Sequence, residues 1–176
     1  MRIESDSVIK YPLELTYRTY RDDLPEFVVH LPNVRSIRVE SREEADGEVR
    51  LVNVWDGGGD IPAAIRHVLS EDMLSWTDYA TWCDADRTCE WTIKTHAFEE
   101  AVRCSGTNRF IEIDDTRTRL EIRGDLSIDL KKVKGVPSFL AGSLGRTVEQ
   151  FLVKQITTNL TSVSAGLSTY LAEREG

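Results

Sequence analysis

The stretch QITTNLTSVSAGLSTYLA, residues 155–172, carries no charged side chain, although 30% of the whole chain is charged. Its apolar residues recur every three to four positions, and small hydroxyl residues fill many of the positions between them. This spacing predicts an α-helix. Because a charge is costly on any face that lies against apolar surface, the composition is compatible with a helix of which only a narrow strip meets solvent. It is equally compatible with a helix that packs against a partner molecule, or with ordinary weakly polar surface.

The same apolar spacing extends towards the N-terminus and predicts a helix of about eight turns. A stripe of this length must be covered by a large apolar surface elsewhere in the chain. The residues of the stripe are Leu140, Leu144, Val148, Phe151 or Leu152, Ile156, Leu160, Val163, Leu167 and Tyr170 or Leu171.

A series of strands supplies that surface. The alternation of apolar and polar residues in 118–130 predicts a strand that buries Leu120, Ile122, Leu126, Ile128 and Leu130 on one face. Segments 74–83, 88–98 and 101–113 show similar patterns and are separated by turn-forming residues, which predicts an antiparallel meander. Gly106 and Gly124 interrupt two of these strands, which indicates bends or close backbone approach in a curved sheet.

The meander is preceded by a predicted hairpin in residues 34–55. Ala45-Asp46-Gly47 is a turn signal. The alternation places Ile37, Val39 and Ser41 on one face of the first strand, and Val49, Leu51, Asn53 and Trp55 on one face of the second.

Before the hairpin, residues 2–10 predict a first strand, and 12–22 and 26–31 predict two short helices. The segment 61–69 is compatible with either a short helix or a covering loop. We expect one domain over residues 1–176, of the α+β class, with a β-α-α-β6-α order and about seven strands wrapped around the C-terminal helix.

From Arg2 to Leu171 this order resembles the helix-grip fold of the START and birch-pollen-allergen superfamily, SRPBCC. The segment 17–55, YRTYRDDLPEFVVHLPNVRSIRVESREEADGEVRLVNVW, is also similar in layout to PRELI-type phospholipid-transfer domains. The resemblance implies a cavity between sheet and helix. The leading hypothesis is therefore non-enzymatic binding or transport of a lipid or another hydrophobic small molecule.

Two alternatives remain open. Members of the superfamily resemble polyketide cyclases or aromatases, which implies a small enzyme, and other similar folds are protein-interaction domains without a ligand. The fold does not choose between them, because function depends on the site that a fold carries.

Aromatic residues on the apolar phase of the predicted elements are the candidate pocket lining. Gln155 and Asn159, one helical turn apart, are predicted to face the pocket as well. Asp78 would be a general base if Trp76 and Trp82 face inward, whereas the opposite strand phase would bring Tyr79 inward. The aromatic candidates are Trp55, Trp76, Trp82, Trp91, Phe110 and Phe151.

Several other classes of function are disfavoured by the sequence. A net charge of −8 opposes nucleic-acid binding. His30, His67 and His96 lack the paired spacing of a metal site, and we expect neither a metal nor a cofactor. The three cysteines, Cys83, Cys89 and Cys104, form no CxxC pair, which favours reduced structural thiols.

The location and surface contacts of the protein follow from weaker signals. The sequence shows neither a secretory signal nor an apolar run long enough to span a bilayer, so that we expect a cytoplasmic protein without integral membrane association. Lys131, Lys132 and Lys134 form a basic cluster that would either touch anionic lipid transiently or lie in a solvated turn. The loop 55–60, with glycine at 57–59, is predicted to lie at the pocket mouth.

Overall fold

The computed structural model describes residues 1–129, 132 and 144–175. Within these residues, short 3-10 helices accompany the main elements: η1 (Phe27–His30), η2 (Ala63–Ile65) and η3 (Glu71–Met73). The α-helices are α1 (Leu13–Asp22) and α2 (Leu144–Glu175). The strands are β1 (Arg2–Ile9), β2 (Val34–Ala45), β3 (Glu48–Gly57), β4 (Ser75–Cys83), β5 (Thr88–Thr95), β6 (Val102–Asp114) and β7 (Arg117–Ile128).

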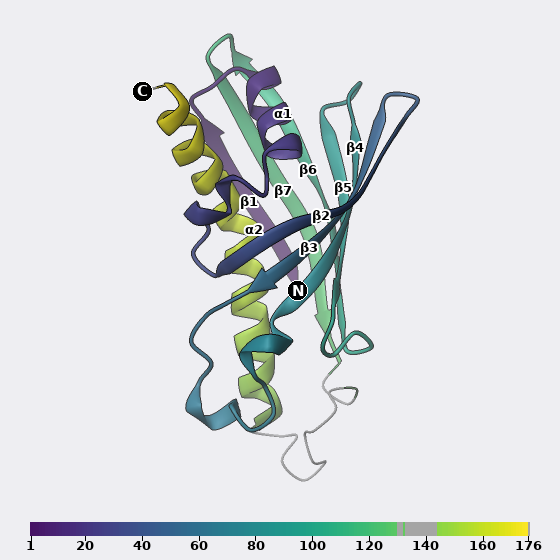
Figure 1. Ribbon diagram of the computed structural model, residues 1–176, viewed down its shortest axis with the longest axis vertical. Coiled ribbons are helices and arrows are strands. Elements are labelled where there is room, and N and C mark those ends of the chain that lie inside the picture. Colours follow the sequence, from purple (N-terminus) through teal and green to yellow (C-terminus); the bar gives the residue numbers. More distant parts are fainter. Residues whose placement is uncertain (130–131, 133–143, 176) are drawn as a thin grey trace.

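The strands form one curved sheet in the order β1-β7-β6-β5-β4-β3-β2, with every neighbouring pair antiparallel. Figure 1 shows α2 running along the sheet beside β1 and β7, and α1 lying over one end of the strands. This arrangement confirms the predicted α+β class, the antiparallel meander and the long terminal helix.

Alternation along the strands decides which face is buried. Leu120, Ile122 and Leu126 of β7 are almost fully buried, as the pattern predicted. In the β2–β3 turn, Asp46 and Gly47 have φ angles of 54° and 80°. Two successive positive φ values are typical of a type I′ hairpin turn, whose twist matches that of the flanking strands.

The predicted face of β2 is right for Ile37 and Val39, which pair in register with Trp55 and Asn53, but wrong for Ser41, which pairs with Val52. Ile37 is buried, but Val39 is 41% exposed and Ser41 is exposed too. β2 is an edge strand, and its pairing with β3 shifts register between Val34 and Ser36 and again between Val39 and Ser41. Each irregularity changes the strand's path and inserts an extra residue, so that simple alternation does not continue along it.

Helix α2 buries much of the predicted stripe, whereas Ile156, Leu160 and Tyr170 are half-buried. Val148, Val163 and Leu167 are 0–1% exposed, and Leu171 is 3% exposed. Leu130 and Leu140 lie outside the described residues. The helix is about 48 Å long at 1.5 Å per residue, which is enough to run the length of the sheet.

Several hydroxyl residues of α2 form hydrogen bonds within the chain. Thr161 Oγ1 donates to the Thr157 carbonyl at 2.8 Å, and Ser168 Oγ donates to the Ser164 carbonyl at 2.9 Å. Ser164 Oγ also lies 3.0 Å from Ser7 Oγ, which ties α2 to β1. Serine and threonine therefore let the helix be enclosed on several sides, because their hydroxyls return to nearby backbone.

Two short segments outside the main elements are irregular. The short helix predicted over 26–31 is the 3-10 helix η1, which covers Phe27–His30 and packs against α2. In segment 61–69, η2 is followed by turns, and Ile61, Ile65 and Leu69 are buried. This segment is a cover for the core rather than a regular helix.

Candidate functional site

A pocket lies between the inner face of the sheet and the two α-helices. Its walls come from α1, β3, β4, β5, β6 and α2, and from the segment that connects β3 to β4. The space measures about 1040 Å³ when solvent at its open side is included, and about 80 Å³ of it admits the centre of a water molecule. Since one water needs roughly 10–15 Å³ by the latter measure, the interior is not solid.

The side chains of β4 alternate between the pocket and the outer face of the sheet. Trp76, Asp78 and Trp82 line the pocket, whereas Tyr79 is 44% exposed on the other face of the sheet. The pairing with β3 sets this phase, because Asn53 stands opposite Asp78 and Trp55 opposite Trp76. The Trp55 and Trp76 rings stack with centroids 5.3 Å apart.

Seven of the nine sequence-predicted site residues are in the lining: Trp55, Trp76, Asp78, Trp82, Trp91, Gln155 and Asn159. Phe110 and Phe151 are not part of it. Phe110 packs edge-on against the Tyr17 and Tyr20 rings, and Phe151 is 8% exposed in the core. The neighbouring Leu152 lines the pocket in place of Phe151.

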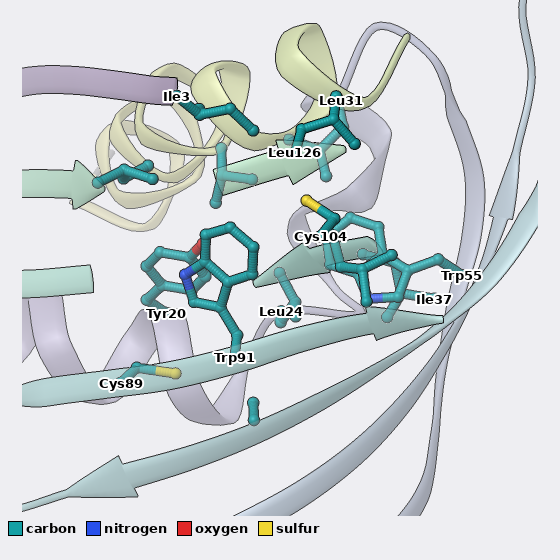
Figure 2. Packing of buried hydrophobic residues seen from close by; sticks show 14 of the residues in the cluster. Ile3, Tyr20, Leu24, Leu31, Ile37, Trp55, Cys89, Trp91, Cys104 and Leu126 are labelled. Atoms are coloured by element: carbon teal, nitrogen blue, oxygen red, sulfur yellow. The ribbon is translucent and has the colours of Figure 1, made fainter. Parts of the chain in front are cut away.

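Two glycines make room for the indole ring of Trp91. Gly106 and Gly124 are directly paired across β6 and β7. A Cβ atom at Gly106 would lie 2.4 Å from Trp91 Cζ2, and one at Gly124 would lie 2.7 Å from Trp91 Cη2. Figure 2 shows the Trp91 ring standing out from its strand near Tyr20. The predicted close approach at the two glycines is therefore a contact with this ring.

Hydrogen bonds hold Trp91 in place. Its Nε1–H donates to Asn108 Oδ1 at 2.9 Å, and Asn108 Nδ2 donates to the Tyr20 hydroxyl at 3.3 Å. All three residues line the pocket. A tryptophan whose polar atom is already satisfied provides a fixed apolar wall.

Other polar atoms in the lining have no hydrogen-bond partner among the described residues. They are Trp55 Nε1, Trp82 Nε1, Asn53 Oδ1, Asn159 Oδ1 and Thr95 Oγ1. A buried polar atom without a partner costs about 1–3 kcal/mol. Because each of these atoms has almost no accessible surface, a ligand in the pocket reaches them only when neighbouring side chains move.

Asp78 is the pocket group with the most unusual environment. Burial is the largest effect on its carboxyl group and raises the pKa of Asp78 to about 7. Asn53 Nδ2 donates to Asp78 Oδ2 at 3.3 Å, and this bond lowers the pKa by a smaller amount. No cation in the described part of the chain contributes to this pKa. The carboxyl is thus poised to exchange a proton near neutral pH.

The remaining ionisable groups of the lining do not titrate near neutrality. Burial raises the pKa of the Tyr20 phenol and of the Cys89 thiol, so that both stay protonated. The Arg21 guanidinium is held by two carboxylates: it donates to both oxygens of Asp22, at 2.9 and 3.0 Å, and to Asp84 Oδ1 at 2.7 Å.

The glycine-rich loop contributes to the lining through Gly57 and Gly58, close to partly exposed residues of the β3–β4 connection. Gly57 N–H donates to the Leu74 carbonyl at 2.8 Å. Gly59 has a φ of 131°, and a Cβ there would lie 2.4 Å from Gln155 Nε2. The loop therefore packs directly against α2.

Sequence reasoning missed Tyr20, Asn53 and Asn108 as site residues. Asn53 had a usable signal, because it is a polar residue on the buried phase of β3. Asn108 likewise lies on the buried phase of β6. Its role depends on the bond to Trp91, which is 17 positions away in the chain, and no local pattern reveals that contact.

Residues outside the pocket have other partners. His30 Nε2 lies 3.1 Å from Glu173, and His96 lies between the Ser75 and Thr77 hydroxyls. The described residues contain no cluster of ligands that could hold a metal ion. All three cysteines are free thiols. Of the basic cluster, Lys131 and Lys134 lie outside the described residues.

No protein-family model and no curated protein matches the sequence. Solved structures do match. Protein TTHA0849 from Thermus thermophilus has 19% identity and a TM-score of 0.65, over 97% of this chain and 99% of that one. The Zhui aromatase/cyclase from Streptomyces sp. R1128 has 16% identity and a TM-score of 0.61, over 97% and 95%.

A third match is norcoclaurine synthase from Thalictrum flavum in complex with dopamine and hydroxybenzaldehyde. It has 9% identity and a TM-score of 0.62, over 98% of this chain and 87% of that one. Identities this low establish the fold and leave the activity open. The curved antiparallel sheet, the long C-terminal helix and these matches together show that the chain has a helix-grip fold.

Proposed function

We propose that the protein binds a largely apolar small molecule in the pocket between the sheet and α2. The observation that carries this proposal is the pocket itself: an interior space whose walls are mainly aromatic and aliphatic, with a few unpartnered polar atoms. Ligand sites of proteins combine these two features, since apolar walls supply affinity and a few polar groups fix orientation. Binding or transport without turnover is the simplest function of such a site.

A pocket-filling substitution tests this proposal. Ala80 is 5% exposed and lines the pocket between Asp78 and Trp82 on β4. Ala80→Ile places a β-branched side chain, which suits a strand, into the space that a ligand needs. Thr81→Ile, on the opposite face of the same strand, is the matched control.

The readout is binding of the neutral fluorescent ketone Prodan, together with mass spectrometry of small molecules extracted from the purified protein. We expect Prodan to bind to the wild type and to Thr81→Ile, and to bind at least about tenfold more weakly to a folded Ala80→Ile. Equal binding to all three proteins, or no binding to any of them, would refute the proposal.

An enzymatic role is the second candidate, and Asp78 is the observation that favours it. A buried carboxyl with a pKa of about 7 is suited to abstract a proton from a carbon next to a carbonyl group. An aromatase/cyclase and a synthase share the fold, which is compatible with this role. Turnover that Asp78→Asn abolishes, with ligand binding unchanged, would favour the enzyme over the carrier.

The third hypothesis, a protein-interaction domain without a ligand, is less well supported. This hypothesis was suggested by the uncharged segment 155–172 of α2. Enclosure of the helix and hydroxyl groups that bond to its backbone explain the absence of charge without a protein partner. No helix in the described part of the chain combines the length and the apolar character needed to cross a bilayer. A cytoplasmic location, a lipid as ligand and contact with membranes remain predictions.

A further inference from the structure

The unpartnered atoms of the pocket define what kind of ligand would satisfy them. Trp55 Nε1 and Trp82 Nε1 are hydrogen-bond donors, whereas Asn53 Oδ1 and Asn159 Oδ1 are acceptors. All four residues are at least nine-tenths buried. A ligand that reaches these atoms and satisfies all of them must therefore offer acceptors as well as donors.

Simple lipid tails and ammonium groups do not meet this requirement. A hydrocarbon chain offers neither kind of group. An ammonium group has three donors and no acceptor, so that it leaves both indole N–H groups unsatisfied. A hydroxyl group both donates and accepts, and a carbonyl oxygen accepts.

The charges of the pocket work against an anion. Arg21 is the only cationic side chain in the described lining, and Asp22 and Asp84 already bind its guanidinium. Asp78 adds a carboxyl group that no cation compensates. A second carboxylate, a phosphate or a sulfonate in this space would be desolvated beside Asp78 without a counter-ion, which is strongly unfavourable.

We infer that the pocket takes a ring compound without negative charge that carries at least two oxygen groups able to donate and accept hydrogen bonds, and that it rejects anions such as fatty acids. The stacked rings of Trp55 and Trp76 and the fixed ring of Trp91 provide flat apolar walls for such a compound. This inference rests on the proposed function, because it specifies the ligand of the same site.

Three probes with one ring system test it: 2,6-dihydroxynaphthalene, 6-hydroxy-2-naphthoate and 6-(aminomethyl)-2-naphthol. They differ in one substituent, which is a hydroxyl, a carboxylate or an ammonium group. Isothermal titration calorimetry at about pH 8 compares them on the wild type, Asp78→Asn and Glu90→Gln. Glu90 is exposed on β5, so its replacement removes one charge away from the pocket.

We expect the diol to bind the wild type at least about tenfold more tightly than the carboxylate. In Asp78→Asn the penalty on the carboxylate should shrink several-fold, and in Glu90→Gln it should not change. The ammonium probe carries the charge opposite to that of Asp78, so its affinity should fall in Asp78→Asn and stay the same in Glu90→Gln. Equal or tighter binding of the carboxylate than of the diol to the wild type would overturn the inference, and so would an ammonium probe whose affinity does not depend on Asp78. So would the absence of any binding by the three probes in a protein that binds Prodan, and this result would leave the proposed function standing.

Discussion

Replacing Asp78 by asparagine should stabilise the protein, and the gain should depend on pH. Burial raises the pKa of Asp78 from its ordinary value of 3.8 to about 7. The unfolded chain therefore releases this proton near pH 4, whereas the folded protein holds it until about pH 7. Over this window the folded state binds more protons than the unfolded state, so that the free energy of unfolding falls as pH rises.

The size of the effect follows from the same values. One pKa unit corresponds to about 1.4 kcal/mol, so the rise from 3.8 to about 7 corresponds to about 4 kcal/mol of stability lost by about pH 8. Asp78 is only half-buried when its solvent-exposed surface is measured. Water in the pocket therefore reduces the free-energy cost of ionising its carboxyl group. We therefore expect a loss of about 2–4 kcal/mol.

Asparagine has nearly the same shape as aspartate and keeps an oxygen to accept the hydrogen bond from Asn53, but it cannot ionise. Urea unfolding should show Asp78→Asn about 2–4 kcal/mol more stable than the wild type at about pH 8, and the gain should shrink to about 1 kcal/mol or less at about pH 4.5. Glu90→Gln should show no comparable gain at the higher pH. A stability difference between Asp78→Asn and the wild type that is the same at both pH values would refute the assignment of a raised pKa to Asp78.

Two further substitutions test the wall that Trp91 forms. Gly106→Ala should lower the free energy of unfolding in urea by about 3 kcal/mol, because its Cβ would meet the Arg123 carbonyl at 2.3 Å and the Trp91 ring at 2.4 Å. Gly58→Ala, whose nearest contact is 3.4 Å, should cost much less. Similar costs for the two substitutions would contradict the packing argument. Asn108→Leu should cost about 1–3 kcal/mol by leaving the Trp91 N–H unpaired; an unchanged unfolding midpoint would show that this bond contributes nothing.

The fold was predictable because its two main signals are long. The apolar stripe of 140–171 and the alternation in strands such as 118–130 each repeat many times, so that single exceptions do not hide the period. Edge strand β2 shows the limit, because register shifts near Val34 and Val39 break a pattern that holds elsewhere.

The site was predictable only in part, for reasons that lie in tertiary structure. Both faces of β4 carry an aromatic residue, so that the choice between Asp78 and Tyr79 as the inward residue required the pairing with β3. The alternation of apolar and polar residues along β5 and β6 places Trp91 and Phe110 on the same inner face of the sheet. The neighbouring rings decide which of the two meets the pocket and which packs in the core.

The central claim is that a guest molecule occupies the space between the sheet and α2 and bonds to its unpartnered polar atoms. The most direct measurement follows the indole N–H signals of the four tryptophans by ¹⁵N nuclear magnetic resonance while Prodan is added. We predict that the signals of Trp55 and Trp82 shift most, because their N–H groups are free to bond to the Prodan carbonyl, and that the signal of Trp91 shifts less, because its N–H is bonded to Asn108. Indole signals that stay unchanged at saturating Prodan would contradict the claim.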